Sequence, residues 1–467
     1  MQTRGGPVPF GAAGETQIHP AVLVALIIAL ILVLTLRRRY VVVPLLLLSV
    51  LVPYGQVVMI GPVHFMVVRI LALLGWARLI LQRFAKEPHP YKIRFNSVDK
   101  AVVLYTITAT IGYTLLWQQS AAFVNELGEM YNVLGFYFLF RFFIRDQRDS
   151  TIVIKTLAIT AMIVATLMVN ELSTGRNVLA GLGGLPDLTL MRQGYLRAQG
   201  PFRVYVTAGA FGATVLPLVL SLWRKGGSRV LAVLGIIAGI TIAVTSRTST
   251  ALVTCVASAL GVGLWVLRDK MKPILCGLAA MLVGLHLVMK APVWALLARI
   301  DLVGGSTGWH RYKIIDNFIS HFWDWCWVGT TNYWTWPGGD DMWDLANQYV
   351  LIGENKGLLP LLCFVATIVY SFKYLGRARR AAGPDLTKAW SLWLLGAALF
   401  ANVVAFFGIS YFDQSFVCWY ALLAMIIAAT MPYKATERTV PILKTFEKCP
   451  TAPAEGIASD RVFVPSR

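Results

Sequence analysis

Long apolar segments recur along the chain and predict a membrane protein that crosses the bilayer many times. The first, AVLVALIIALILVLTL from Ala21 to Leu36, has no charged residue. A spanning helix needs roughly 20 apolar residues, and the segments approach this length. A soluble helix would instead show an amphipathic stripe. Roughly thirteen spans are predicted, starting near Ala21, Val41, Val63, Ala101, Tyr131, Thr151, Val204, Val230, Ala251, Pro273, Gly357, Ala389 and Phe416.

These segments divide the chain into four parts and predict an all-α integral membrane protein with about 12–13 transmembrane helices. Residues 1–290 form an N-terminal transmembrane bundle with a first outer loop near 170–203. Residues 291–356 form a large outer loop that contains an amphipathic helix. Residues 357–432 form the C-terminal transmembrane helices, and residues 433–467 form an inner tail that is predicted to be partly disordered.

Composition and charge support this interpretation and set the orientation. The chain is 57% hydrophobic and 14% charged, whereas soluble proteins carry about 25% charged residues. Its net charge is +19, but the Lys and Arg residues fall in short loops on one side of the predicted spans. The positive-inside rule makes that side cytoplasmic and the N-terminus external. Topology thus explains most of the charge, and nucleic acid is not an expected partner.

The cysteines give no reason to expect a metal or a disulfide framework. Six are present, four of them within apolar segments, where Cys acts as a small hydrophobic residue. No pair has the spacing of metal ligands. We therefore expect neither a structural metal nor a cofactor.

Several arginines lie on the outer side, where the positive-inside rule expects few. They form three clusters: Arg176, Arg192, Arg197 and Arg203; Arg247 in the turn TSRTST; and Arg311 beside Lys313. The planar guanidinium suits phosphate oxygens. A single such arginine is readily explained by contacts with lipid head groups or a local carboxylate. Three clusters on one face favour a shared diphosphate site.

The second outer loop predicts a helix that lies along the membrane surface. RYKIIDNFISHFW, Arg311 to Trp323, places its apolar residues at helical spacing on one face. Seven of the fifteen Trp residues lie between Trp309 and Trp343. They are typical of an interfacial aromatic belt, and they also suit stacking on the apolar faces of sugar rings.

Carboxylates precede the next apolar segment in GDDMWDLANQYVLIGENKGLLPLL, Gly339 to Leu362. Asp340, Asp341 and Asp344 could accept a proton from a hydroxyl nucleophile, because an aromatic setting near a membrane raises a carboxyl pKa. Two other interpretations remain open, which are capping of a following helix and binding of a divalent metal. The sequence offers no supporting His or Glu at a recognisable metal spacing.

Four segments together resemble the O-antigen ligase and O-antigen polymerase superfamily of bacterial envelope glycosyltransferases. RAQGPFRVYVTAGAFGATVLPL is similar to the family's Arg–Gly–Phe segment, and TSRTSTALV is similar to its Ser-Arg turn. GWHRYKIIDNFISHFWDWCWVGTTN resembles the segment with an Arg and an amphipathic helix. LANQYVLIGENKGLLPLL resembles the family's signature, His-Asn-x-Tyr-Leu followed by Glu-x-Gly-Leu. The matching residues are Asn347, Tyr349, Glu354, Gly357 and Leu358.

The resemblance implies a GT-C-like helical fold, an undecaprenyl-diphosphate-linked glycan as donor and a glycan acceptor. It implies that Arg197, Arg247 and Arg311, with Arg203 as a neighbour, bind the diphosphate. Asn347 and Tyr349 match the signature and are expected to contact substrate. The signature's usual His is Ala346 here, which cannot move a proton. Asp344 is therefore the first candidate for the general base and His310 the second.

The sequence thus predicts a glycosyltransferase in the bacterial inner membrane with its active site facing the periplasm, acting as a polysaccharide polymerase or ligase. The absence of this His argues in particular against the interpretation of the chain as a lipid A ligase. The alternatives are a lipid-linked glycan transporter or flippase and a structural subunit of an envelope complex. A flippase would place cations along a central cavity, whereas the arginines here cluster at the outer face.

Overall fold

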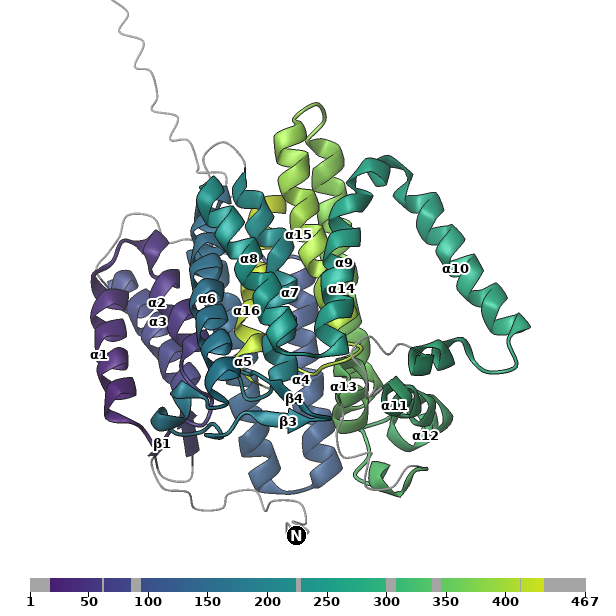
Figure 1. Ribbon diagram of the computed structural model, residues 1–467, viewed down its shortest axis with the longest axis horizontal. Coiled ribbons are helices and arrows are strands. Elements are labelled where there is room, and N and C mark those ends of the chain that lie inside the picture. The colour runs from purple at the N-terminus through teal and green to yellow at the C-terminus, as the bar shows by residue number, and fades with distance from the viewer. Residues whose placement is uncertain are drawn as a thin grey trace, which may run out of the picture. The chain divides into compact units, whose positions relative to one another are not determined.

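The computed structural model describes residues 17–60, 63–84, 94–223, 228–299, 308–337, 346–411 and 413–431. The predicted tail, 433–467, lies outside these residues, as does Asp344. Most described residues are helical (Figure 1). The first half contains α1 (Pro20–Thr35), α2 (Val42–Leu51), β1 (Val57–Ile60), β2 (Val63–Met66), α3 (Val67–Phe84), α4 (Ser97–Trp117), α5 (Ser120–Phe143) and α6 (Gln147–Thr174).

The second half begins with the hairpin β3 (Leu190–Arg192) and β4 (Tyr195–Arg197). Four helices follow: α7 (Tyr205–Leu220), α8 (Arg229–Thr245), α9 (Ser249–Gly263) and α10 (Met271–Val288). The outer segment holds α11 (Gly308–Ser320), α12 (Phe322–Trp325) and α13 (Gln348–Lys356). The chain then forms α14 (Leu358–Ala381), α15 (Leu386–Ala405) and α16 (Ser415–Thr430).

Several helices have the length and apolar composition of membrane spans. Among the described residues, six continuous helical segments qualify, and three shorter apolar helices, α1, α8 and α16, accompany them. One of the six, Ser249–Val288, combines α9 and α10 through a 3₁₀ segment, Leu264–Lys270. The chain is thus a helical protein with multiple candidate spans, as the apolar segments predicted.

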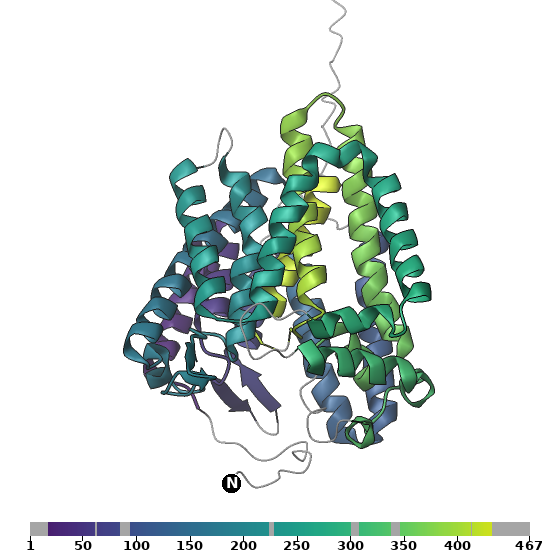
Figure 2. The ribbon, with the colours of Figure 1, turned by 45° about the vertical axis from the view of Figure 1, so that its right-hand side comes forward.

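The helices pack around α16, which lies in the middle of the bundle (Figures 1 and 2). It contacts α2, α5, α6, α14 and α15, and most of its side chains are buried, including Met425 and Ile426. α7 packs on α8 and α9, and α4 packs on α14 and α5. By contrast, α10 has no buried residue and extends away from the bundle (Figure 1), so its apolar surface is available to lipid.

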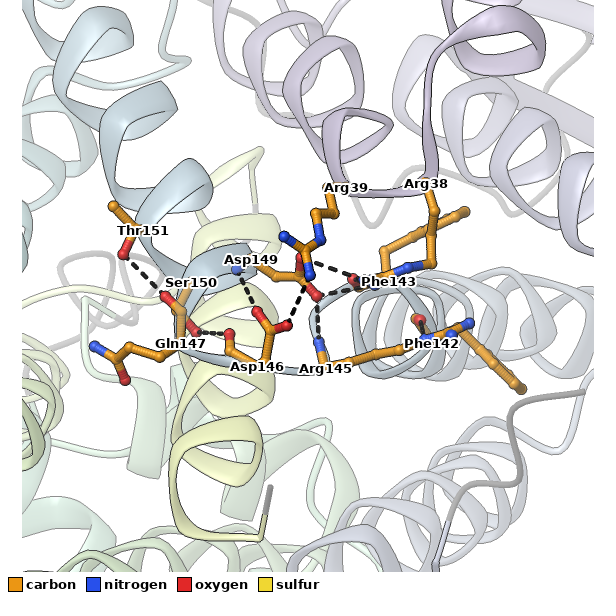
Figure 3. Close-up of polar contacts among 10 residues, drawn as sticks. All are labelled: Arg38, Arg39, Phe142, Phe143, Arg145, Asp146, Gln147, Asp149, Ser150 and Thr151. Atoms are coloured by element: carbon orange, nitrogen blue, oxygen red, sulfur yellow. Dashed lines mark hydrogen bonds and ion pairs between the residues drawn. The ribbon is translucent and has the colours of Figure 1, made fainter. Parts of the chain in front are cut away.

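Two of the basic turns predicted to be cytoplasmic lie against each other. Figure 3 shows the α1–α2 turn against the α5–α6 turn. Arg38 Nη1 lies 2.9 Å from Asp149 Oδ2, and Arg39 Nη2 lies 3.2 Å from Asp146 Oδ2. The Asp149 side chain is only 1% exposed, so the Arg38–Asp149 pair is better shielded from solvent than a typical surface ion pair, whereas the Arg39–Asp146 pair is exposed. They explain how the very short RRRY connection is held in place.

Two short β-hairpins depart from the all-α prediction. The span expected to begin at Val63 begins as a helix at Val67, because Val63–Met66 pairs antiparallel with Val57–Ile60. The intervening Gly61-Pro62 dipeptide is a turn signal in sequence. The second hairpin, β3–β4, lies in the first outer loop, with Leu190 opposite Arg197.

The amphipathic helix predicted at Arg311–Trp323 is confirmed as α11, which begins three residues earlier and ends at Ser320. Its buried Ile314 packs against Val350 of α13. Phe318 stacks on Trp325 with ring centroids 3.9 Å apart. The tryptophans of this loop divide into two groups, because Trp325 and Trp336 are buried whereas Trp323 and Trp327 are exposed.

Candidate functional site

The turn between α8 and α9 is the centre of the candidate site. Arg247 occupies the left-handed backbone region with φ 46°, which is uncommon for a long side chain and marks a constrained position. Thr248 caps α9 by accepting a hydrogen bond from Ala251 N. Gly209 of α7 lies against the turn, where an added Cβ would come within 2.3 Å of Ser246 Oγ. A larger residue at this position would displace the turn.

The β3–β4 hairpin brings Arg197 to this turn. Ala198 N donates a hydrogen bond to Thr245 O at the end of α8 over 3.2 Å. Arg247 Cζ lies 5.2 Å from the ring centroid of Tyr195, and Arg197 Cζ lies 5.2 Å from that of Tyr205. Alternate residues of a strand share a face, so Tyr195, on which Arg247 stacks, and Arg197 lie on the same side of β4.

Arg311 reaches the same turn from α11. Its Nη2 donates a hydrogen bond to Thr250 Oγ1 over 2.6 Å, and Thr250 Oγ1 donates to Gly408 O over 3.3 Å. Thr250 lies three residues after Arg247, in the first turn of α9. Arginines from β4, the α8–α9 turn and α11 therefore all belong to this turn or to segments that contact it, and we call Arg197, Arg247 and Arg311 the arginine cluster.

The Gly200–Arg203 turn is held rigidly next to the arginine cluster. Glu171 of α6 accepts hydrogen bonds from Gln199 N and Gly200 N at 3.1 and 2.8 Å. Gln414 Nε2 donates to Pro201 O over 2.7 Å. The Arg203 side chain is exposed, while its backbone N–H faces the buried carboxylate of Asp413. Arg203 thus flanks the cluster, as expected from its position two residues after Pro201.

Charge compensation distinguishes two members of the cluster from other arginines. Arg141 is paired with Asp99, and Arg38 is paired with Asp149. Within the described residues, neither Arg197 nor Arg247 has an ion-pair partner. Arg197 is only 7% exposed, and its Nε has no hydrogen-bond partner there. An uncompensated buried guanidinium is costly, which indicates a site suited to an anion.

Two predicted substrate contacts are occupied by structural interactions. Asn347 is buried and caps α13, accepting hydrogen bonds from Tyr349 N and Val350 N. The Tyr349 hydroxyl donates to Val403 O over 3.1 Å, and its ring packs on Phe364, Phe406 and Phe407. No described contact brings either side chain to the arginine cluster. Capping, one of the alternatives for this segment, is thus performed by Asn347.

The structure describes one of the two candidate bases and not the other. His310 lies in the first turn of α11, immediately before Arg311. Asp344 lies outside the described residues. The described part of the chain contains no group of three His, Cys, Asp or Glu residues placed to hold a metal ion.

Glu354 is a further buried carboxyl group, from the signature segment. It is 2% exposed, and its Oε2 has no hydrogen-bond partner among the described residues. Burial raises the pKa of Glu354 to about 8. The carboxyl group is therefore mostly protonated at neutral pH.

Sequence reasoning missed two clusters of charged and polar side chains that are partly or fully buried. Arg69 Nε donates to Asn132 Oδ1 over 3.1 Å, and Arg69 Nη2 lies 3.4 Å from Glu129 Oε1. Lys356 Nζ lies 2.9 Å from Glu126 Oε2. A signal for both was present, because an ionisable residue close to an apolar segment is a site candidate in a membrane protein.

Comparison with known proteins does not assign the chain to a family. No protein-family model and no curated protein sequence matches it.

Proposed function

We propose that the chain is a membrane glycosyltransferase that moves a glycan from undecaprenyl diphosphate to an acceptor sugar at the outer face. The observation that carries this proposal is the arginine cluster. Arg197 is buried without an acidic partner among the described residues, and Arg247 and Arg311 meet at the adjoining turn. A diphosphate would supply the missing negative charge and accept the guanidinium hydrogen bonds in pairs.

The chemistry requires charge stabilisation at one place and a proton acceptor at another. An acceptor hydroxyl oxygen forms a bond to the anomeric carbon while the bond from that carbon to the diphosphate oxygen breaks. The lipid diphosphate leaves with the electron pair, and arginines stabilise its charge. The hydroxyl proton passes to a general base, for which Asp344 and then His310 remain the candidates.

Polymerase and ligase share this chemistry and differ in the acceptor. The resemblance described above supports both, and Ala346 at the usual His position favours a polymerase over a lipid A ligase. The gathering of three arginines at one end of the bundle supports chemistry at one face over passage of a glycan through the membrane. A bilayer is the expected environment in either case.

The test is reconstitution of the purified protein with undecaprenyl-diphosphate-linked repeat units, with products resolved by gel and mass spectrometry. We expect a ladder of longer lipid-linked glycans from a polymerase. Arg247→Lys should remove most activity without unfolding the protein, because an ammonium cannot replace the guanidinium fork. Arg192→Lys, in the exposed β3 strand of the same loop, is the matched control.

Supplying an acceptor glycan in a second reaction tests a ligase. If neither reaction shows transfer and the same protein carries the donor across liposome membranes, the protein is a transporter and not an enzyme. Full activity in Arg247→Lys would remove the diphosphate assignment.

A further inference from the structure

A polar cavity is formed by residues other than those of the arginine cluster. It measures about 80 Å³, well above the roughly 10–15 Å³ needed to hold one water molecule. Residues from α4, α5, α13, α14 and α16, from the segment after α2 and from the α15–α16 connection line it. Its polar lining includes Tyr54, Tyr105, Glu129, Asn132, Gln348 and Tyr420.

Several polar groups of this lining have no protein partner. The hydroxyls of Tyr54, Tyr105 and Tyr420 make no hydrogen bond within the described ranges, although Tyr420 is only 7% exposed. Gln348 Oε1 accepts a hydrogen bond from Tyr411 N over 2.7 Å, whereas its Nε2 has no partner in the described part of the chain. These groups line one cavity, where a polar ligand can complete their hydrogen bonds.

Glu129 provides the matching acceptor. Arg69 Nη2 and Asn132 Nδ2 both contact its Oε1, at 3.4 and 3.1 Å. Its Oε2 has no partner in the described ranges, and the side chain is 43% exposed. Glu129 lines the same cavity as Tyr54, Tyr105 and Tyr420. The carboxylate therefore lies among the unpartnered hydroxyls, fixed through one oxygen.

The ligand must both donate and accept hydrogen bonds and must offer an apolar face. Glu129 Oε2 accepts, Gln348 Nε2 donates, and tyrosine hydroxyls do either. Aromatic rings supply the remaining wall, including Phe416 and Trp419. A sugar ring has this combination, because its hydroxyls lie at the edge and its C–H groups form apolar faces.

We propose that this cavity binds a sugar ring, that of the acceptor glycan. The identification of this sugar as the acceptor rests on the proposed function, whereas sugar binding itself follows from the lining of the cavity.

The first arm of the test measures sugar binding to the full chain in lipid nanodiscs. The probes are methyl glycosides of glucose, galactose, mannose, rhamnose and N-acetylglucosamine, detected by saturation-transfer difference NMR. We expect at least one to bind. Glu129→Gln and Tyr105→Phe should weaken that binding about tenfold or more, the size of effect expected for a hydrogen bond to a charged group. Binding by none, or equal binding by all variants, would overturn the proposal.

Stability separates a ligand site from a structural one. Tyr105→Phe removes a hydroxyl without a protein partner, so it should keep or raise the unfolding temperature while sugar binding falls. Tyr131→Phe is the matched control, because its hydroxyl donates to Arg69 O over 3.1 Å and it does not line the cavity. It should lower the unfolding temperature and leave sugar binding unchanged. The reverse pattern would make the cavity tyrosines structural.

The second arm uses farnesyl diphosphate to separate this inference from the proposed function. Arg197→Ala should lose diphosphate binding and keep glycoside binding, and Glu129→Gln should do the opposite. Diphosphate binding without glycoside binding would overturn the cavity proposal and leave the glycosyltransferase standing. Glycoside binding without diphosphate binding would support the cavity as a sugar site and remove the arginine cluster from donor recognition.

Discussion

Arg311 Nη2 donates a hydrogen bond of 2.6 Å to Thr250 Oγ1, which ties the amphipathic helix α11 to the first turn of α9. The two residues are 61 positions apart in the chain. Through this bond the outer segment reaches the turn that carries Arg247, and the same hydroxyl contacts Gly408 O between α15 and α16. Thr250 is therefore the junction that orients Arg311 in the arginine cluster.

Thr250→Val should reduce glycan transfer without unfolding the protein. Valine keeps the branched shape but removes the acceptor, and a hydrogen bond to a charged group contributes about 1.5–3 kcal/mol, so a decrease of about tenfold or more is expected. Thr250→Ser keeps the hydroxyl and should restore most of the rate. Transfer by Thr250→Val at the wild-type rate would show that Arg311 is positioned by other contacts.

Lys356 and Glu126 should show strong coupling in a double-mutant cycle. Their side chains are 17% and 4% exposed, and the pair joins α13 to α5. Lys356→Met alone leaves a buried carboxylate, so a loss of about 3–5 kcal/mol is expected. The double variant Lys356→Met, Glu126→Leu should regain much of it. Denaturation followed by a folding-sensitive fluorescence signal measures this, and additive losses would show that the pair does not interact.

Glu354 should make the stability of the folded chain depend on pH. Burial raises its pKa from 4.5 to about 8. Between these values the unfolded chain ionises Glu354 while the folded chain keeps it protonated, so its contribution is fully present below pH 4.5 and is lost as the pH rises through about 8. The loss has an upper limit of about 5 kcal/mol, since one pKa unit corresponds to about 1.4 kcal/mol.

Glu354→Gln provides the comparison for this pH effect, because the amide is uncharged throughout. Unfolding temperatures measured from pH 4 to 9 should fall more steeply for the wild type than for the variant. Parallel curves for the wild type and the variant would show that Glu354 ionises in the folded chain as a solvent-exposed carboxyl group does.

Asn347→Ala should destabilise α13 by about 1 kcal/mol, the usual cost of losing an N-cap. Asn347→Asp retains the acceptor oxygen for Tyr349 N and Val350 N and should cost less. Hydrogen exchange of the α13 amides measures both. A loss of glycan transfer in Asn347→Ala with unchanged exchange would instead support the substrate contact implied by the signature.

The sequence by itself predicted the helical character, the multiple candidate spans, the basic turns between helices and the amphipathic helix α11. Each depends on hydrophobic period, segment length or local charge, which can be counted along the chain. It also singled out Arg197, Arg247 and Arg311 as unusual, because an arginine on the outer side breaks a local rule.

Only the tertiary structure decided which of these residues meet. Two contacts depend on packing between segments far apart in the chain. One joins Arg311 to Thr250, and the other joins Arg247 to the Tyr195 ring of β4. The cavity around Glu129 is lined by residues from five helices and two connecting segments, so no local pattern marks it. Asn347 had the sequence signature of a substrate contact, but its backbone position at the start of α13 directs its oxygen to two amide groups. Side-chain partners are set by the fold, whereas segment type is set by local composition.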